Sequence, residues 1–392
     1  MLIAVAGGKL QGVEAVYLAQ KAGFQTIIID KNPDAPAVRL CDQFIKFEFK
    51  VDNPVPPDCP KPDLILPAIE DEKVLSLIQV WAKKCNIPFA FDMNAYLISS
   101  SKIKSDTLFR KMHLPAPEPW PDCGFPVVIK PDNASGSHDV AIIDNATDFS
   151  SRFSTIKIPD NTIVQQFLDG DSFSIEVLGQ PGSYQALQVT DLSMDKDYDC
   201  KKVTAPTRLS QQQIRNFKKM GIAIAREINL NGIMDVEVIL HQNKLKLLEI
   251  DARLPSQTPI TVFWSTGINM VQILTNLFVD NSHVSNQITC QTIPWRARAK
   301  YERAVIVEHI KVCEQKIEFA GEHIMTMDGS LKVMPDFFGS NEAITSFEED
   351  KNQWVATMIF CGASQNEISV KRDACYKKIV EHMKNCVEEP VH

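Results

Sequence analysis

The sequence has no excess of positive charge, which excludes one large class of partners. Asp and Glu outnumber Lys and Arg by 49 to 41, and the formal net charge at pH 7 is −8. Proteins that bind a nucleic-acid backbone normally present a basic surface, so we expect no nucleic-acid partner. A negative charge suits cationic small molecules, although a charge of this size is also ordinary for a globular protein.

The ten cysteines form no Cys-x-x-Cys pair and no cluster with histidine. Structural zinc sites need such spacing, so zinc is not expected, and scattered cysteines are typical of a reduced compartment. Met1 leads directly into the apolar segment 2–6 without a signal peptide, and the most apolar later stretch, 259–279, is interrupted by polar residues. These features predict a cytoplasmic protein without a membrane-spanning segment.

The glycines near the start do not complete a dinucleotide-binding motif. Residues 7–12 read Gly-Gly-Lys-Leu-Gln-Gly, which lacks the Gly-x-Gly-x-x-Gly spacing of a pyrophosphate cradle. The order of strand, glycine turn, helix and Asp30 still leaves an NAD(P)-dependent oxidoreductase as an alternative. A non-catalytic nucleotide-binding or scaffold protein is a second alternative, and it predicts that no ADP is released.

The length of 392 residues favours two or three domains. Residues 1–94 alternate between apolar strands and amphipathic helices, which indicates an α/β, Rossmann-like domain with a parallel sheet. Residues 95–295 carry alternating strands and a helix near 210–228, which is typical of an α+β domain with an antiparallel sheet. Residues 296–392 predict a small β-rich lobe that ends in a helix over 364–385.

Two strands of the middle part carry the most informative group of acids. Asp235 and Glu237 alternate along the first strand, and Glu249 and Asp251 along the second, with a tight turn near residue 243 between them. Alternation places each pair on one face, and the turn places residue 237 opposite residue 249. Carboxylates that converge need a counter-charge, which magnesium bound to phosphate oxygens supplies. The alternative is a solvated strand face that binds nothing.

A lysine at a strand end and the loop that follows it predict a phosphate site. Lys130 ends the strand 126–130, and residues 132–140 form a loop of mostly small residues. Backbone N–H groups of such a loop can cover phosphates, so the loop is a candidate lid, although a surface turn fits as well. Further upstream, Lys102 and Lys104 open a helix and offer a second lysine.

Taken together, these segments resemble the ATP-grasp superfamily. The resemblance rests on Leu-Pro-x-Pro at 114–117, Pro-Val-Val-x-Lys-Pro at 126–131, a small-residue loop, a hinge strand, and Glu237 followed by Glu249-Ile-Asp-Ala-Arg253. It covers about residues 1–295 and implies an ATP-grasp fold that follows a Rossmann-like domain. The implied enzyme is an ATP-dependent ligase. ATP phosphorylates a carboxylate, and an amine then displaces phosphate from the acyl phosphate to form an amide.

The resemblance assigns residues to the nucleotide. Lys102 and Lys130 would contact the ATP phosphates, with Lys104 as the substitute for Lys102. The triphosphate would be covered by the loop residues Ser135, Gly136 and Ser137. In the hinge strand, Gln165 would accept from the adenine amine, and the Leu168 N–H would donate to the ring.

Two nucleotide positions depart from the family pattern. Gln165 stands where the hinge usually has Glu. Ser172 stands where an acid usually binds the ribose, so Asp171 would serve instead.

The same resemblance assigns the metal and catalytic residues. Glu237, Glu249 and Asp251 would hold two magnesium ions, with Asp251 in place of the usual Asn. Arg253 and Lys130 would be the catalytic residues, because their positive charges oppose the negative charge that develops on the transferred phosphoryl group.

Over its whole length the chain resembles those ATP-grasp ligases that join two diamino acids, so L-lysine and a methylated D-ornithine derivative are the expected small-molecule substrates. Their ammonium groups need carboxylates. The acids Glu70, Asp71 and Glu72 follow the strand 63–67, at the end of a parallel strand where ligands bind. Gln11 and Gly12 begin a helix whose N–H groups suit an α-carboxylate. We expect these two segments to hold lysine, although acids are also favoured at a helix start for electrostatic reasons alone.

The candidates for binding the D-amino acid are Glu176, Asp235 and Ser256. Within the superfamily, a purine-biosynthesis carboxylase or another amino-acid ligase remains an alternative. The sequence does not fix the oligomeric state, and a homo-oligomer stays open.

Overall fold

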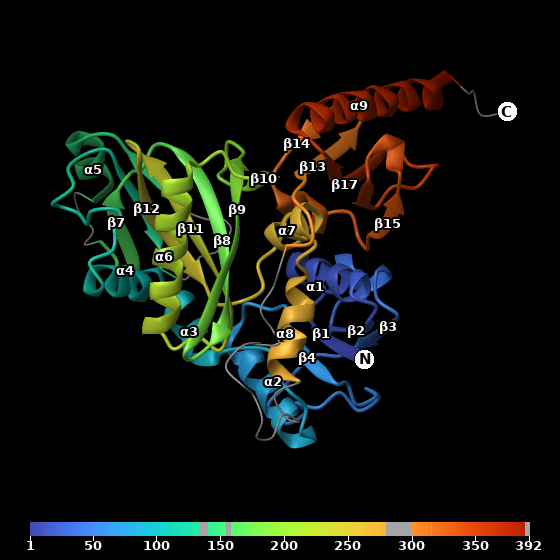
Figure 1. The fold of residues 1–392 in the computed structure, drawn as a ribbon, viewed down its shortest axis with the longest axis horizontal. Helices are drawn as coiled ribbons and strands as arrows, with labels where there is room; N and C mark the ends of the chain where they lie inside the picture. Colours follow the sequence, from blue (N-terminus) through green and yellow to red (C-terminus); the bar gives the residue numbers. More distant parts are fainter. Residues whose placement is uncertain (133–139, 154–157, 280–298, 315, 389–392) are drawn as a thin grey trace. The chain divides into compact units, whose positions relative to one another are not determined.

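The computed structural model describes residues 1–132, 140–153, 158–279, 299–314 and 316–388. The chain forms two compact units (Figure 1). Unit 1 consists of Met1–Phe91, Cys200–Thr207 and Arg253–His392, and unit 2 of Asp92–Asp199 and Arg208–Ala252. The mixed α/β and α+β fold class is confirmed, whereas the division into three consecutive domains stays a prediction.

The first part of unit 1 is a parallel sheet in the order β3-β2-β1-β4. Its strands are β1 (Leu2–Ala6), β2 (Gln25–Asp30), β3 (Gln43–Lys46) and β4 (Leu64–Pro67), and its helices are α1 (Leu10–Lys21), η1 (Pro36–Arg39) and α2 (Glu72–Cys85). The apolar runs of β1, β2 and β4 are almost completely buried. Parallel strands covered by helices read as continuous apolar segments, and this pattern made them predictable.

Helix α2 begins and ends where its sequence specifies. The Asp71 side chain accepts hydrogen bonds from Lys73 N and Val74 N, which satisfies two donors of the first turn. Asn86 ends the helix in the left-handed conformation, which asparagine tolerates well. Helix α2 therefore spans Glu72–Cys85 with a sequence-encoded cap at each end.

Helix α1 starts very close to the end of β1. A Cβ atom on Gly12 would lie 2.2 Å from the Gly7 carbonyl oxygen, so a larger residue does not fit there. Gly7 itself has a φ of 111°, a conformation that other L-residues rarely adopt. These glycines allow the first turn of α1 to lie directly against the tip of the parallel sheet.

The second part of unit 1 is an antiparallel sheet in the order β10-β13-β17-β16-β15, with β14 paired to β13. Its strands are β10 (Cys200–Ala205), β13 (Ala304–Cys313), β14 (Lys316–Phe319), β15 (Lys332–Pro335), β16 (Glu342–Thr345) and β17 (Gln353–Gly362). The helices are α7 (Thr258–Thr266), α8 (Met270–Phe278), η3 (Glu322–Thr326), η4 (Phe337–Gly339) and α9 (Gln365–Glu388). The expected β-rich segment with a terminal helix is present. The sequence reading did not predict α7 and α8, which together span the apolar stretch 259–279.

Unit 2 contains two antiparallel sheets, β12-β11-β8-β9 and β6-β5-β7. Its strands are β5 (Val127–Pro131), β6 (Ala141–Ile143), β7 (Thr162–Gln166), β8 (Asp171–Gln180), β9 (Ser183–Met194), β11 (Gly232–His241) and β12 (Lys244–Asp251). The helices are α3 (Met93–Ser99), α4 (Lys102–Lys111), α5 (Ala146–Phe153) and α6 (Gln211–Glu227).

Helix α6 covers one face of the larger sheet of unit 2 (Figure 1). Phe217 and Ile224 of α6 share a core with Phe173, Ile175 and Val177 of β8. Successive strand residues point to opposite faces, so the intervening residues of β8 and its neighbours point away from this core. The candidate acids lie on that second face.

Among the described residues, no helix is both long enough and apolar enough to cross a membrane.

Within unit 1, Tyr17 connects α1 to two later segments. Its hydroxyl donates to Glu342 Oε2 at 2.6 Å and accepts from Trp264 Nε1 at 2.8 Å, and the residue is 1% exposed. We expect Tyr17→Phe to reduce the free energy of unfolding by about 1.5–3 kcal/mol, because a charged acceptor loses its buried donor. Scanning calorimetry measures the resulting fall in melting temperature. The half-exposed Tyr198 gives the control Tyr198→Phe, and equal melting temperatures for the two variants would contradict the expectation.

Candidate active site

Five carboxylates lie in register on three neighbouring strands of unit 2. Glu237 of β11 pairs with Glu249 of β12, and Asp235 pairs with Asp251. On the other side of β11, Asp235 pairs with Glu176 of β8. The prediction that residues 237 and 249 lie opposite each other is confirmed, and the five residues are called the acid row below.

The acid row is most deeply buried at its β8 end. Glu176 is 0% exposed and Asp235 is 7% exposed, and Ser174 donates a hydrogen bond to Asp235. Glu237, Glu249 and Asp251 are only partly buried. The acid row is therefore no fully solvated strand face, because it passes from the interior to an accessible edge.

Two lysines of unit 2 provide positive charge near the acid row. Lys102 Nζ lies 3.3 Å from Glu249 Oε1. Lys130 is 7% exposed, and this burial lowers its pKa, while the charges of Glu249 and Asp106 act in the opposite direction. Lys104 instead donates to the Leu97 carbonyl oxygen at 2.9 Å. Of the two lysines that open α4, the structure thus brings Lys102 to the acids.

Gln165 and Asp106 hold Lys130 in a small buried network. With its amide oriented to satisfy both neighbours, Gln165 donates to Asp106 Oδ2 at 2.9 Å and accepts from Lys130 Nζ at 3.2 Å. Burial raises the pKa of Asp106, and the charge of Lys130 opposes that rise. The predicted contact of Gln165 with adenine stays a prediction, and its amide oxygen already accepts from Lys130.

Asp106 was not among the residues predicted from the sequence. The available signal was its position four residues after Lys102, which places both side chains on one face of α4. That spacing alone cannot reveal Lys130 and Gln165, which lie on β5 and β7.

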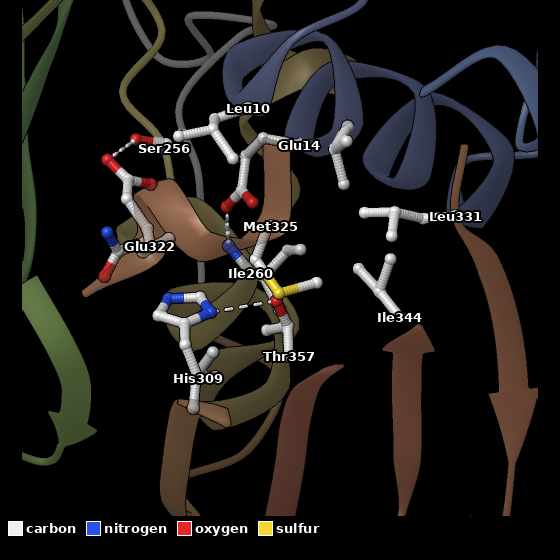
Figure 2. Close-up of a pocket in the computed structure, with 13 residues that line it drawn as sticks. Leu10, Glu14, Ser256, Ile260, His309, Glu322, Met325, Leu331, Ile344 and Thr357 are labelled. Atoms are coloured by element: carbon white, nitrogen blue, oxygen red, sulfur yellow. Dashed lines mark hydrogen bonds between the residues drawn. The ribbon is translucent and has the colours of Figure 1, made fainter. Parts of the chain in front are cut away.

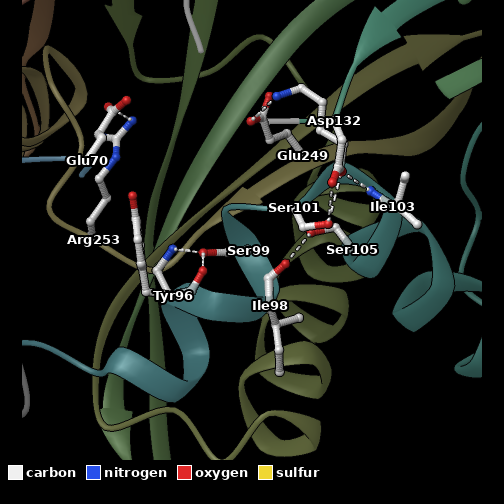
Figure 3. A network of polar contacts seen from close by, with 12 residues as sticks. Glu70, Tyr96, Ile98, Ser99, Ser101, Ile103, Ser105, Asp132, Glu249 and Arg253 are labelled. Atoms are coloured by element: carbon white, nitrogen blue, oxygen red, sulfur yellow. Dashed lines mark hydrogen bonds and ion pairs between the residues drawn. The ribbon is translucent and has the colours of Figure 1, made fainter. Parts of the chain in front are cut away.

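The start of α4 is tied to the end of β5. The Ser101 hydroxyl donates to Asp132 at 2.9 Å, and Ile103 N donates to the same carboxylate at 2.9 Å (Figure 3). Ser101 also caps the helix by accepting from Lys104 N. These bonds fix the turn of α4 that carries Lys102.

The predicted lid residues Ser135, Gly136 and Ser137 lie outside the described residues.

The hinge and ribose candidates follow β7 in unit 2. Leu168 is 6% exposed and Ser172 is 9% exposed. Asp171 forms an ion pair with Arg208 at 2.9 Å, and Arg208 also lies 3.6 Å from Asp191. A ribose bound by Asp171 would therefore share this carboxylate with Arg208.

The magnesium prediction can be tested against the donors that are present. Among the described residues, no group of three or more Asp, Glu, His or Cys side chains is placed to hold a metal ion by itself. Magnesium usually takes one or two carboxylates and completes its shell with phosphate oxygens and water. The facing pair of Glu237 and Glu249 provides that number of oxygen donors, so the residues fit magnesium bound together with a polyphosphate.

In unit 1, Glu70 is the centre of a second polar cluster. Arg253 Nη2 lies 2.9 Å from Glu70 Oε1, and Gln11 Nε2 donates to the same oxygen at 3.0 Å (Figure 3 shows the Arg253–Glu70 pair). The neighbouring Asp71 caps α2, while Glu72 is exposed in the first turn. Glu70, Asp71 and Glu72, the three acids predicted to bind lysine, thus have different environments. Asp71 serves as the N-cap of α2.

Ser256 also lies in unit 1, where its hydroxyl donates to Glu322 Oε1 at 2.9 Å. The other two candidates for the D-amino acid, Glu176 and Asp235, belong to the acid row of unit 2.

Comparisons with known proteins agree with this geometry. Residues 99–257 match a family model described as an ATP-grasp domain. The chain is 31% identical to a 3-methyl-D-ornithine–L-lysine ligase of Methanosarcina barkeri, over 94% of this chain and 95% of that protein. Its fold is similar to a Campylobacter jejuni biotin carboxylase complex (TM-score 0.71, 14% identity, 99% of this chain and 95% of the other). It is also similar to an L-amino acid ligase of Bacillus licheniformis (TM-score 0.65, 14% identity, 96% and 97%).

The Asp106 network yields a test. We expect Asp106→Ala to weaken ATP binding about tenfold or more, because Gln165 and Lys130 lose the buried carboxylate that positions them. Isothermal titration calorimetry of the variant with ATP measures this. The exposed Asp122 of the same unit gives the control Asp122→Ala. Equal ATP affinities for the two variants would show that Asp106 does not position these groups.

Proposed function

This chain belongs to the ATP-grasp superfamily, and from that membership we propose that it joins the carboxylate of (3R)-3-methyl-D-ornithine to the ε-amine of L-lysine. A relative with this substrate pair in its name is 31% identical over nearly the full length of both chains. The structural observation that carries the proposal is the acid row beside Lys102 and Lys130, because it suits a magnesium–triphosphate complex. Formation of an amide from these substrates is a step of pyrrolysine biosynthesis.

Within this proposal, Glu237, Glu249 and Asp251 would hold two magnesium ions, which would supply positive charge to the phosphate oxygens of ATP. Lys130 approaches the phosphates from β5 and Lys102 from α4. Burial lowers the pKa of Lys130, the charges of Glu249 and Asp106 oppose that lowering, and Lys102 lies beside Glu249.

The reaction requires activation of an unreactive carboxylate. One carboxylate oxygen of the D-amino acid attacks the γ-phosphorus of ATP, the bond to the β-phosphate oxygen breaks, and ADP leaves. The neutral ε-amine of lysine then attacks the carbonyl carbon of the acyl phosphate. The bond to the phosphate oxygen breaks, and inorganic phosphate and an amide result. Negative charge gathers on the transferred phosphoryl group in the first step, and the guanidinium of Arg253 is the proposed group that neutralises it.

The proposed lysine site lies in unit 1. The first-turn N–H groups of α1, at Gln11 and Gly12, would bind the α-carboxylate of lysine. Glu72 would bind its α-ammonium group, since Asp71 caps α2 and Glu70 contacts Arg253 and Gln11. This assignment leaves the ε-amine of lysine available to react.

The substrates in this proposal are small molecules, and the protein acts in the cytoplasm without a nucleic-acid or membrane partner. An assembly into homo-oligomers stays a prediction from the sequence.

The metal site has a direct test. We expect the double variant Glu237→Gln/Glu249→Gln to lower the rate of ADP release at least about a hundredfold, since the magnesium–triphosphate complex loses two charged ligands. A coupled ADP assay with D-ornithine, L-lysine, ATP and magnesium gives the rate, and mass spectrometry identifies the amide. The exposed Glu227 gives the control Glu227→Gln. Wild-type rates in the double variant would refute the magnesium site.

The lysine site has its own test. We expect Glu72→Gln to raise the KM for L-lysine about tenfold while leaving the KM for ATP within about twofold, because a charge-assisted bond to the α-ammonium is lost. Asp71→Asn is the matched control, since its amide oxygen can still cap α2. If Asp71→Asn raises the lysine KM and Glu72→Gln does not, the assignment of the two acids is reversed.

A further inference from the structure

The end of β12 carries two groups of the proposed site and contacts α3. Ala252 lies between Asp251 and Arg253, so the position of its peptide group affects where both neighbouring side chains begin. Among the described strands, β12 pairs with β11 alone, which makes it the edge strand of its sheet. Backbone N–H groups on the open side of an edge strand need partners from outside the sheet.

Ser99, the last residue of α3, supplies such a partner. Its hydroxyl oxygen accepts from Ala252 N at 2.9 Å, and the hydroxyl donates in turn to the Tyr96 carbonyl oxygen at 3.3 Å (Figure 3). Ser99 is 3% exposed and Ala252 is 2% exposed, so water cannot replace the hydroxyl unless the packing opens. A buried hydrogen bond therefore fixes the end of β12 to α3.

The turn between α3 and α4 also fixes two other parts of the site. Ser101 caps α4, and its hydroxyl donates to Asp132, which directly follows β5. Residues 99–101 therefore connect the end of β12 and the end of β5 with the start of α4. Each of these three elements carries a residue of the proposed site, namely Asp251, Lys130 and Lys102.

The chain that follows Ala252 has separate anchors within unit 1. Ser256 donates to Glu322 Oε1 at 2.9 Å, and Ile260 N donates to Glu14 Oε1 at 2.6 Å (Figure 2). These contacts hold the start of α7 and do not involve α3. A substitution at position 99 should therefore shift the end of β12 locally without releasing the chain beyond it.

We propose that Ser99 is a positioning residue, which holds the end of β12 so that Asp251 can ligate magnesium and Arg253 can reach the transferred phosphoryl group. The inference rests on the proposed function, which gives these two residues their roles. Ser99 acts through the Ala252 peptide and takes no part in the chemistry. Its effect on the rate follows because a displacement of about 1 Å in a catalytic group can lower a rate about a hundredfold.

Three substitutions at position 99 separate this role from a loss of packing. Ser99→Ala removes the acceptor, Ser99→Cys fills the space with a weaker acceptor, and Ser99→Thr keeps the hydroxyl. We expect kcat for ADP release to fall about tenfold or more in Ser99→Ala, to fall less in Ser99→Cys, and to recover in Ser99→Thr. The KM for L-lysine should stay within about twofold of wild type, because its proposed binding groups are not attached to β12.

The magnesium dependence of ATP binding gives a second readout, which needs neither amino acid. Isothermal titration calorimetry measures the ATP affinity of the full chain at a series of Mg²⁺ concentrations. We expect Ser99→Ala to need about tenfold more Mg²⁺ than wild type for half of the maximal gain in affinity, since residues that orient a metal ligand affect metal affinity by this order. Ser99→Thr should again resemble wild type.

Ser105→Ala is the matched control. Ser105 is also 3% exposed, and its hydroxyl donates to the Ile98 carbonyl oxygen at 3.3 Å. The variant thus loses one buried hydroxyl from the same region while the bond to Ala252 N stays intact. We expect it to lose some stability, measured as a fall in melting temperature, and to keep the kcat and the magnesium dependence of wild type.

The outcomes separate the positioning role from the ligase function. If folded Ser99→Ala matches Ser105→Ala in kcat and in magnesium dependence, Ser99 does not position the end of β12, even when wild type releases ADP normally. If Ser99→Ala does not fold, the same comparison is made with Ser99→Cys.

A different result identifies failure of the proposed function. If wild type releases no ADP with D-ornithine and lysine, while Ser99→Ala still shifts the magnesium dependence, the ligase function is refuted and the positioning role is supported. An ATP affinity of wild type that does not respond to Mg²⁺ would overturn both the metal site and the role of Ser99.

Discussion

The pairing of β8, β11 and β12 is the constraint on which the rest of the site depends. It places five carboxylates on one sheet face while α6 seals the other face with an apolar core. Like charges at this spacing repel each other, and burial of Glu176 and Asp235 disfavours their charged forms. Cations beside these carboxylates therefore stabilise the fold as well as serving the proposed chemistry. Lys102 and Lys130 meet part of this demand, and the cations that accompany a triphosphate are suited to meet the remainder.

In unit 1, too, one carboxylate has more than one partner. Glu70 was predicted to bind a substrate ammonium, and in the structure one of its oxygens contacts both Arg253 and Gln11. The arginine proposed for phosphoryl transfer and the glutamine proposed for lysine recognition thus share one carboxylate. A change at Glu70 would disturb both groups together, which makes it a poor position for separating their roles.

The sequence was most informative where local rules determine the geometry. The facing of Glu237 and Glu249 followed from strand alternation and a short turn. It was least informative where partners come from distant segments. The network of Asp106, Lys130 and Gln165 joins a helix and two strands, and only tertiary packing brings them together. The choice between Lys102 and Lys104 likewise depended on which side of the first turn of α4 faces β12.

Unit 1 is assembled from three separate stretches of chain, whereas all of unit 2 is synthesised between the first stretch and the last. Tyr17 and its partner Glu342 are 325 positions apart. At a ribosomal rate of about 5–20 residues per second, Glu342 is synthesised about 15 to 65 s after Tyr17. During translation the side of α1 that packs against α7 and α8 therefore has no partner yet, while unit 2 can complete its own core. Chaperone dependence should accordingly be greatest for the segment that leaves the ribosome first.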